Sequence, residues 1–160
     1  MAEHLRGGCR CGAVRYTIDL PGPAGFYACH CRQCQRLLGT AFALNMPVLR
    51  EAVTITGTVD RTDYASSPGR GNRLYTCPTC LSHVIYANSW RRGVLGVRVG
   101  TLDDLGGCEM LGHIWTSSRQ QWLTIDDGRP QFEGQPSEEA WQALFGSRNA
   151  IFDRAAPARE

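Results

Sequence analysis

The sequence contains no lysine, so arginine supplies all 17 of its permanent positive charges. These arginines are scattered along the chain, and Arg91 and Arg92 form the only adjacent pair. The formal net charge is +2 over 160 residues. A charge this small and this dispersed excludes a basic surface built to bind nucleic acid or an anionic membrane.

Long apolar segments are also absent. No apolar run approaches the ~18 residues that span a membrane, and residues 1–8 lack the apolar stretch of a secretion signal. We therefore expect a cytoplasmic protein whose thiols stay reduced. In that compartment the 8 cysteines of this chain indicate metal binding rather than disulfide bonds.

One domain is expected, because no linker, internal repeat or low-complexity tract divides the chain. It should span residues 1–160, with 147–160 as a peripheral tail.

Within this domain, Tyr16, Ile18 and Leu20 alternate with polar residues, which is the pattern of a half-buried strand. Similar short apolar segments predict further strands at 26–28, 40–46, 53–56, 74–76, 84–87, 94–99, 110–115 and 122–125.

Only two helices are expected, at 32–38 and 138–145. The second has clear start and stop signals, since Ser137 can cap its first turn and Gly146 can end it. Many short strands combined with so few helices predict a mainly β fold.

The cysteines form three closely spaced groups and one isolated residue. They are Cys9 and Cys11, then Cys29, Cys31 and Cys34, then Cys77 and Cys80, and finally Cys108. Close pairs suit zinc, because a short turn can direct two thiolates at one ion. A structural zinc needs four ligands, which two pairs provide. The predicted structural ligands are therefore Cys9, Cys11, Cys77 and Cys80.

The middle group offers three thiolates from one segment and leaves one tetrahedral position open. Catalytic zinc sites keep such a position for water or substrate. Three thiolates make zinc a poor generator of hydroxide but a good partner for a fourth thiolate. Cys29, Cys31 and Cys34 therefore predict a second zinc that acts on a thiol. His30 could close the site, but between two ligands of an extended segment it would point away from them.

Two other functions stay open at this point. The chain could be a zinc-stabilised binding module without catalysis, in which the middle group is closed or empty. Alternatively, Cys29, Cys31 and Cys34 could form a redox switch, although the βαβ pattern of a thioredoxin-like fold is missing. Cys108 is most simply a small buried residue, and packing is the default role for His113.

The cysteine groups and their flanking residues resemble the glutathione-dependent formaldehyde-activating enzyme family. The resemblance runs through segments 7–16, 29–34, 77–80, 100–104, 113–115, 118–122 and 127–128. It implies an antiparallel β-tent fold of small sheets around zinc, with two zinc ions per chain. It also implies a structural zinc on the two-pair set and a catalytic zinc on the three-cysteine group, in agreement with the spacing.

The resemblance further implies an activity. The family's named member condenses formaldehyde with glutathione to S-hydroxymethylglutathione, and it is classed as a carbon–sulfur lyase for the reverse direction. The expected partners are therefore a small thiol such as glutathione and a small aldehyde. No single arginine is indicated as the partner of a substrate carboxylate. The candidates are Arg15, Arg32, Arg36, Arg73 and Arg98.

One residue departs from the family's pattern, which usually has glycine directly after the C-x-x-C pair. This chain has Leu81 at that position. Glycine would permit a left-handed backbone, a conformation that costs a residue with a side chain ~1 kcal/mol. We therefore expect a differently shaped turn around Cys80, with the ligands themselves intact.

Overall fold

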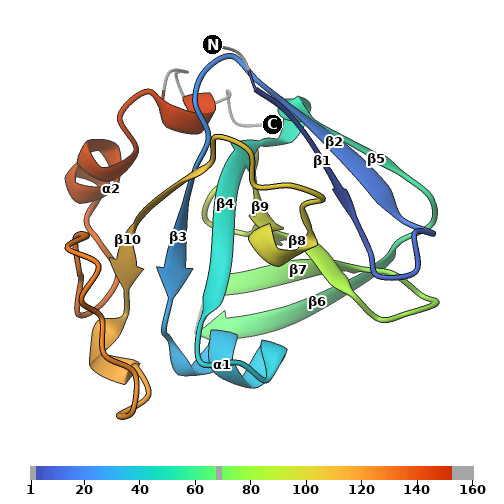
Figure 1. The fold of residues 1–160 in the computed structure, drawn as a ribbon. Coiled ribbons are helices and arrows are strands. Elements are labelled where there is room, and N and C mark those ends of the chain that lie inside the picture. The colour runs from blue at the N-terminus through green and yellow to red at the C-terminus, as the bar shows by residue number, and fades with distance from the viewer. Residues whose placement is uncertain (1–2, 68–69, 153–160) are drawn as a thin grey trace.

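The computed structural model describes residues 3–67 and 70–152. Its strands are β1 (Glu3–Gly8), β2 (Arg15–Leu20), β3 (Gly25–Cys29), β4 (Ala43–Leu49), β5 (Val53–Thr56), β6 (Asp60–Ser67), β7 (Arg70–Thr76), β8 (His83–Asn88), β9 (Val94–Arg98) and β10 (Glu109–Ile114). Within the described ranges they form a 3-stranded sheet, β1-β2-β5, and a 7-stranded sheet, β10-β3-β4-β9-β8-β7-β6 (Figure 1). The mainly β fold is confirmed.

Helices are few and short in the described ranges. They are the α-helices α1 (Arg32–Leu38) and α2 (Glu138–Phe145) and the 3-10 helices η1 (Arg50–Ala52), η2 (Val99–Thr101), η3 (Thr116–Ser118) and η4 (Arg148–Ala150). Both α-helices occupy their predicted ranges. Ser137 caps α2 by accepting a hydrogen bond from the amide of Ala140 at 3.2 Å. None of the helices in the described ranges has the length and apolar character needed to cross a membrane.

Neighbouring strands pair antiparallel in both sheets, except that β10 lies parallel to β3. The sequence predicts neither β1 nor β6, because neither segment has alternating apolar residues. Both segments are strands because β1 pairs with β2 and β6 pairs with β7. The strand predicted at 122–125 is wrong. That segment pairs with no strand in the described part of the chain, and Trp122 is 73% exposed.

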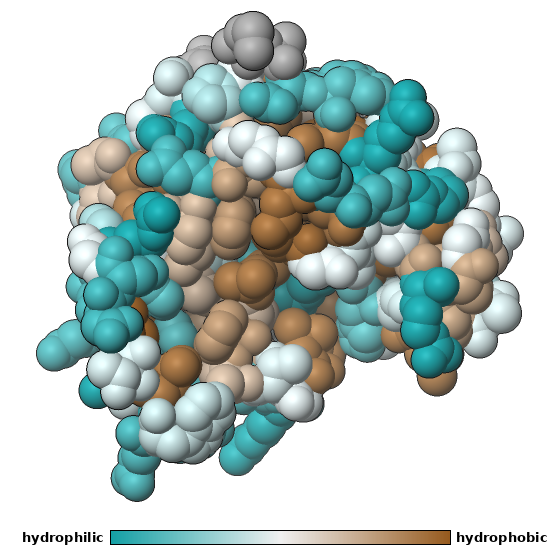
Figure 2. Space-filling model, viewed as in Figure 1, coloured by the Kyte–Doolittle hydropathy of each residue, from teal (hydrophilic) through white to brown (hydrophobic). Residues whose placement is uncertain are grey.

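The main hydrophobic core lies between the two sheets. The smaller sheet contributes Tyr16 and Ile18, and the larger contributes Met46, Ile85 and Val97. The buried residues of β2 alternate as the sequence predicts, since successive side chains of a strand point to opposite faces. Figure 2 shows hydrophobic side chains gathered across the middle of one face, around β4, with hydrophilic side chains around them.

A second hydrophobic cluster forms where α2 packs beside β3 and β10. Trp141 and Phe145 of α2 contact Tyr27 edge-on, with ring centroids 4.9 Å and 6.4 Å away. Cys31 and Cys34 pack against the same cluster. Figure 1 shows α2 on the opposite side of the molecule from the smaller sheet. The three-cysteine group therefore lies beside a packed aromatic support.

The segment expected to be a peripheral tail is packed into the fold over residues 148–150. Asn149 is 1% exposed. Its Nδ2 donates to the carbonyls of Gly25 and Pro47, each at 2.7 Å, and its Oδ1 accepts from the amide of Gly25 at 2.7 Å. This amide ties the segment to β3 and β4. The last part of the expected tail, 153–160, lies outside the described residues.

Candidate metal centres

Four cysteines converge from two hairpin turns. Cys9 and Cys11 lie in the turn between β1 and β2, and Cys77 and Cys80 lie in the turn between β7 and β8 (Figure 1). All four Sγ atoms lie within 4.8 Å of one another. The four-cysteine cluster thus joins the smaller sheet to the larger one, and it unites the residues that the spacing predicts.

The sulfur positions in this cluster fit a tetrahedral ion. Zinc binds thiolates at ~2.3 Å, which places neighbouring sulfurs of a tetrahedron ~3.8 Å apart. The Sγ of Cys11 lies 3.5 Å from that of Cys9 and 3.7 Å from that of Cys77. The cluster can therefore hold a metal ion with little rearrangement of the two turns.

Hydrogen bonds from the two turns favour the thiolate form of two members of this cluster, Cys9 and Cys80. The amide of Val14 donates to the Sγ of Cys9 at 3.2 Å. The Ser82 hydroxyl lies 3.2 Å from the Sγ of Cys80, and this hydrogen bond lowers the pKa of Cys80 to about 5. A hydrogen bond to the charged form stabilises that form. The thiolate is also the form that binds a metal.

The turn after Cys80 has a left-handed backbone although it carries leucine. Leu81 has a φ of 61°, and its amide donates to the carbonyl of Cys77 at 2.9 Å, which closes the turn. The Leu81 side chain is 69% exposed, so packing does not offset the conformational cost. The expected change of turn shape is therefore wrong. The turn that carries Cys77 and Cys80 keeps its left-handed residue at a cost of ~1 kcal/mol.

The three-cysteine cluster lies where β3 runs into α1. Cys29 ends β3, Cys31 caps α1 and Cys34 lies in the first turn of that helix. Their Sγ atoms also lie within 4.8 Å of one another. In the described part of the chain, no fourth Cys, His, Asp or Glu joins them. Cys29 is buried, whereas the other two are partly exposed, so the cluster is partly accessible to solvent.

Local structure favours a thiolate in this cluster as well. The amide of Cys34 donates to the Sγ of Cys31 at 3.4 Å, so Cys31 is the N-cap of α1. Hydrogen bonds from Cys29 and Cys34 hold the pKa of Cys31 far below its usual range. The same contacts with Cys31 and Cys34 raise the pKa of Cys29. These contacts favour the thiolate form, which is the form that binds a metal, at Cys31.

His30 lies between two of these cysteines, yet it belongs to a different network. Its side chain is fully buried, and its Nε2 lies 3.0 Å from the Nδ1 of His113. The Nε2 of His113 lies 3.0 Å from a carboxylate oxygen of Asp127. His30 is therefore not a fourth ligand in this structure, and His113 links it to a surface carboxylate instead of serving only as packing.

The network has a defined proton arrangement when His113 is neutral. The Asp127 carboxylate can only accept, because its hydrogen bond with His113 lowers the Asp127 pKa. The Nε2 of neutral His113 therefore carries the ring proton and donates it to Asp127. The Nδ1 of His113 accepts a hydrogen bond from the Nε2 of His30. Burial, with the charges of His113 and Arg119, lowers the pKa of His30 to about 4. His30 is therefore neutral at pH 7 and tethers the cysteine segment to the 127 loop.

Polar and aromatic side chains line one face of the larger sheet beside the three-cysteine cluster. Tyr27, Asn45 and Arg98 occupy one register row across β3, β4 and β9. Tyr27 precedes Cys29 by two residues, so the two side chains share a face. The hydroxyls of Tyr27 and Tyr86 lie 3.3 Å apart. Burial raises the pKa of Tyr86 to about 12, so its hydroxyl stays protonated.

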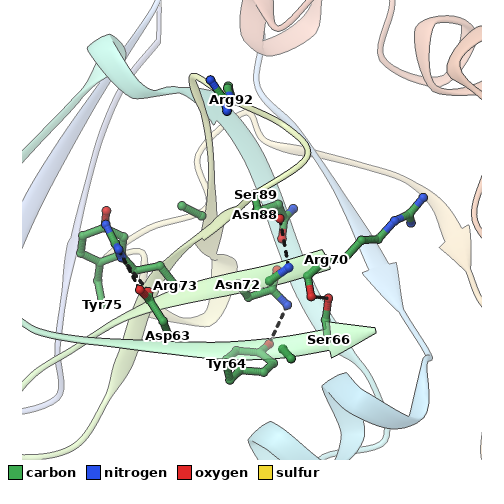
Figure 3. A pocket seen from close by; sticks show the side chains of 13 residues that line it. Asp63, Tyr64, Ser66, Arg70, Asn72, Arg73, Tyr75, Asn88, Ser89 and Arg92 are labelled. Atoms are coloured by element: carbon green, nitrogen blue, oxygen red, sulfur yellow. Dashed lines mark hydrogen bonds and ion pairs between the residues drawn. The ribbon is translucent and has the colours of Figure 1, made fainter. Parts of the chain in front are cut away.

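A surface hollow of about 1030 Å³ lies over β6, β7 and β8 (Figure 3). Tyr64 and Asn72 line it and are joined by a hydrogen bond of 2.9 Å. Gln33 of α1 donates a hydrogen bond to the carbonyl of Ser66 at its rim. Burial raises the pKa of Tyr64, and the nearby thiol of Cys34 contributes to that rise. The hollow therefore adjoins the three-cysteine cluster without enclosing it.

Charged side chains also line the hollow. Asp63 and Arg73 pair with each other at 2.7 Å. Arg70 and Arg92 have no ion pair within the described ranges, and Figure 3 shows the Arg70 side chain extending away from the sheet. The Arg70 guanidinium carbon lies 5.3 Å from the centroid of the Trp90 ring. The hollow thus presents two arginines that have no carboxylate partner within the described residues.

Comparison with known proteins agrees with this arrangement. The sequence model of the family described as glutathione-dependent formaldehyde-activating enzyme matches residues 4–118, a range that holds both cysteine clusters. The chain belongs to this family. A Halomonas elongata protein that carries the family's name provisionally is 25% identical over 154 residues, covering 89% of this chain and 96% of its own.

A solved structure supports the fold of the family member described here. The crystal structure of a Rhodobacter sphaeroides protein is 21% identical and covers 66% of this chain and 98% of its own, with a TM-score of 0.50. This likeness concerns the fold alone. Sequence reasoning placed Asp127 in a segment that resembles the family but gave it no role, and it overlooked Tyr86. Both reach the cysteine segment only through tertiary contacts.

Proposed function

We propose that this protein is a zinc-dependent carbon–sulfur lyase that joins a small thiol to a small aldehyde and splits the adduct in the reverse direction. The observation that carries the proposal is the cluster of Cys29, Cys31 and Cys34, which has three ligands and no fourth within the described residues. Glutathione and formaldehyde are the first substrates to test, because the family's description names them.

Zinc is the ion that we propose for both clusters, since all-thiolate sets of three or four ligands favour it. Two zinc ions per chain are therefore expected. At the three-cysteine cluster, zinc would supply a Lewis acid with one open position that holds a substrate thiol as its thiolate. The reaction gains further from bringing two small reactants together in a suitable orientation.

The rest of the site comes from this chain's own side chains. Cys31 caps α1, and the neighbouring His30 is tethered through His113, so the ligand segment is held at its middle by two contacts. The hydroxyls of Tyr27 and Tyr86 are hydrogen-bonded to each other, and burial raises the pKa of both, so both stay protonated. When one hydroxyl donates to the other, the second can donate to an oxygen of a ligand. These groups give the ligand segment a rigid and partly polar surrounding.

The hollow beside the cluster supports a thiol that carries carboxylates. Its volume of about 1030 Å³ is at the upper end of the ~300–1,000 Å³ of small-molecule sites. Arg70 and Arg92 offer guanidinium groups that bind carboxylates well. A peptide thiol such as glutathione would place its carboxylates there and its sulfur at Cys31 and Cys34.

We also propose that the protein works in the cytoplasm. A reducing compartment keeps thiols available as ligands. The eight cysteines, all free in this structure, are in keeping with that proposal.

The decisive experiment follows adduct exchange by NMR in a mixture of glutathione and formaldehyde, with and without the zinc-loaded protein. We expect two zinc ions per chain and exchange faster than in buffer. Cys31→Ser is the matched control and should return the rate to that of buffer. Absence of any acceleration by the fully loaded wild-type protein would overturn the proposal.

The same preparation separates the other two functions. A binding module without catalysis predicts one inert zinc ion and no effect of added thiol on the metal. A redox switch predicts a disulfide among Cys29, Cys31 and Cys34 after mild oxidation, detected by mass spectrometry, with loss of the second zinc.

A further inference from the structure

Arg98 is a buried cation in the row of polar side chains that faces the three-cysteine cluster. It is 7% exposed. In the described part of the chain its guanidinium makes one hydrogen bond, from Nη1 to the Oδ1 of Asn45 at 2.6 Å, and forms no ion pair. Its Nε is buried and has no hydrogen-bond partner.

Burying a guanidinium of this kind costs folding free energy unless an anion pairs with it. Burying a charge without a partner is strongly unfavourable, and buried arginines are therefore normally paired with carboxylates or phosphates. Arg98 instead faces a neutral amide and the ring of Tyr86, whose centroid lies 4.4 Å from the guanidinium carbon. The protein's own side chains leave donors of Arg98 unused.

The register of the sheet places these donors near the cysteines. Asn45 pairs with both Tyr27 on β3 and Arg98 on β9, and Cys29 is on the same face as Tyr27. Two strand spacings of ~4.8 Å separate β3 from β9, a span that the long Arg98 side chain partly crosses.

The guanidinium is held in place before any ligand arrives. Asn45 is 1% exposed, and its Nδ2 is engaged with the carbonyl of Ala43 at 3.3 Å. This bond orients the amide oxygen toward Arg98. Tyr86 covers one face of the guanidinium and lies over Gly96, where a Cβ would stand 2.1 Å from the Tyr86 ring. A preorganised donor of this kind stabilises developing negative charge without a reorganisation cost.

We propose that Arg98 is the oxyanion-binding residue of the three-cysteine site and donates to the oxygen of the aldehyde. This rests on the proposed function. The thiol first gives its proton to solvent, and the thiolate sulfur then bonds to the carbonyl carbon. The electron pair of the C=O π bond moves to oxygen, where Arg98 stabilises the alkoxide until a proton from solvent completes the hemithioacetal. The reverse reaction uses the same contacts.

The first test measures anion binding without turnover. Formate is titrated calorimetrically into zinc-loaded wild-type protein and into Arg98→Met, with Arg50→Met as the control because Arg50 is exposed and belongs to η1. We expect Arg98→Met to bind formate at least tenfold more weakly than wild type, with Arg50→Met unchanged. Equal affinity of wild type and Arg98→Met, or no binding by wild type, would overturn the assignment of Arg98.

The second test measures the rate of adduct formation. Loss of one oxyanion donor typically lowers kcat by ~10²–10³, so we expect a loss in that range for Arg98→Met with the Kd for glutathione changed less than threefold. Arg98→Lys keeps the charge and lacks the Nε donor, and it should lose at least tenfold in kcat even where Arg98→Met folds poorly. Unchanged kcat in Arg98→Lys would contradict the proposal.

The two proposals fail in different ways. Formate binding that depends on Arg98, combined with no acceleration by wild type, refutes the proposed lyase activity and supports the anion site. Acceleration by wild type that persists in both Arg98 variants refutes the role of Arg98 and supports the lyase.

Discussion

The two cysteine clusters use the same ligand atom in different structural settings. The four-cysteine cluster draws on two turns that are 66 residues apart between Cys11 and Cys77, and it joins the two sheets. The three-cysteine cluster comes from one segment of six residues, 29–34, that is already held by β3 and α1. A metal in the first would close a long loop, whereas a metal in the second would close almost none.

This difference suggests that the four-cysteine cluster stabilises the fold and that the three-cysteine cluster carries the chemistry. The free energy of binding a structural metal is also free energy of folding, because the unfolded chain has no preformed site. A site that spans two sheets therefore contributes to the fold, and a site within one turn contributes much less. The second cluster also lacks a fourth ligand in the described residues, and its neighbours include polar side chains such as Arg98 and Tyr86.

The largest expected effect is that of Cys77→Ser. Structural zinc contributes ~10–16 kcal/mol in small zinc domains, comparable to the ~5–15 kcal/mol of total stability of a typical domain. We expect Cys77→Ser to lose cooperative thermal unfolding, measured by circular dichroism. Cys108→Ser is the control, because Cys108 belongs to neither cluster. A normal melting curve for Cys77→Ser would contradict the structural role of this cluster.

Cys31→Ser should separate the two clusters most clearly. Serine is a good N-cap and can keep the amide of Cys34 satisfied, so we expect a stability loss of at most ~2 kcal/mol. The zinc content, measured by metal analysis, should fall from two ions per chain to one. The exchange rate should fall to that of buffer. If Cys31→Ser loses cooperative unfolding as Cys77→Ser does, the assignment of a structural role to one cluster and a catalytic role to the other is wrong.

A smaller effect is expected for His113→Phe. This variant leaves the Nε2–H of His30 buried without a partner, which costs ~1–3 kcal/mol. Denaturant unfolding of the zinc-loaded protein measures the loss. Asp127→Asn is the control, since its amide oxygen can still accept from His113 and its side chain is 39% exposed. Unchanged stability of His113→Phe would show that the network does not hold the cysteine segment.

The smallest effect, and the only gain, is expected for Leu81→Gly. Glycine adopts the left-handed backbone of this position without steric cost, so stability should rise by up to ~1 kcal/mol. Thermal unfolding measures the change. Leu105→Gly is the control, because Leu105 is also exposed, at 45%, and does not have a positive φ. A loss of stability in both variants would contradict the account of the turn.

Local features of the fold and site were predictable from the sequence. The cap at Ser137 and the alternation along 15–20 predict α2 and β2, because a helix turn and a strand face depend on neighbouring residues. Strand β6 was not predictable, since its polar residues form a strand only through pairing with β7. For the same reason, nothing local indicated the burial of Asn149 between β3 and β4.

The sequence by itself determined the cysteine pairs that can share an ion, since residues two or three positions apart are held within reach of one metal by the backbone alone. The tertiary structure brought the pairs Cys9–Cys11 and Cys77–Cys80 into one cluster, and within the described residues it places no fourth ligand beside Cys29, Cys31 and Cys34. Only the tertiary structure decided that Arg98 and the His30–His113–Asp127 network lie beside those three. Their positions depend on sheet register and on contacts across 83 residues, where long-range packing and not local geometry sets the distances.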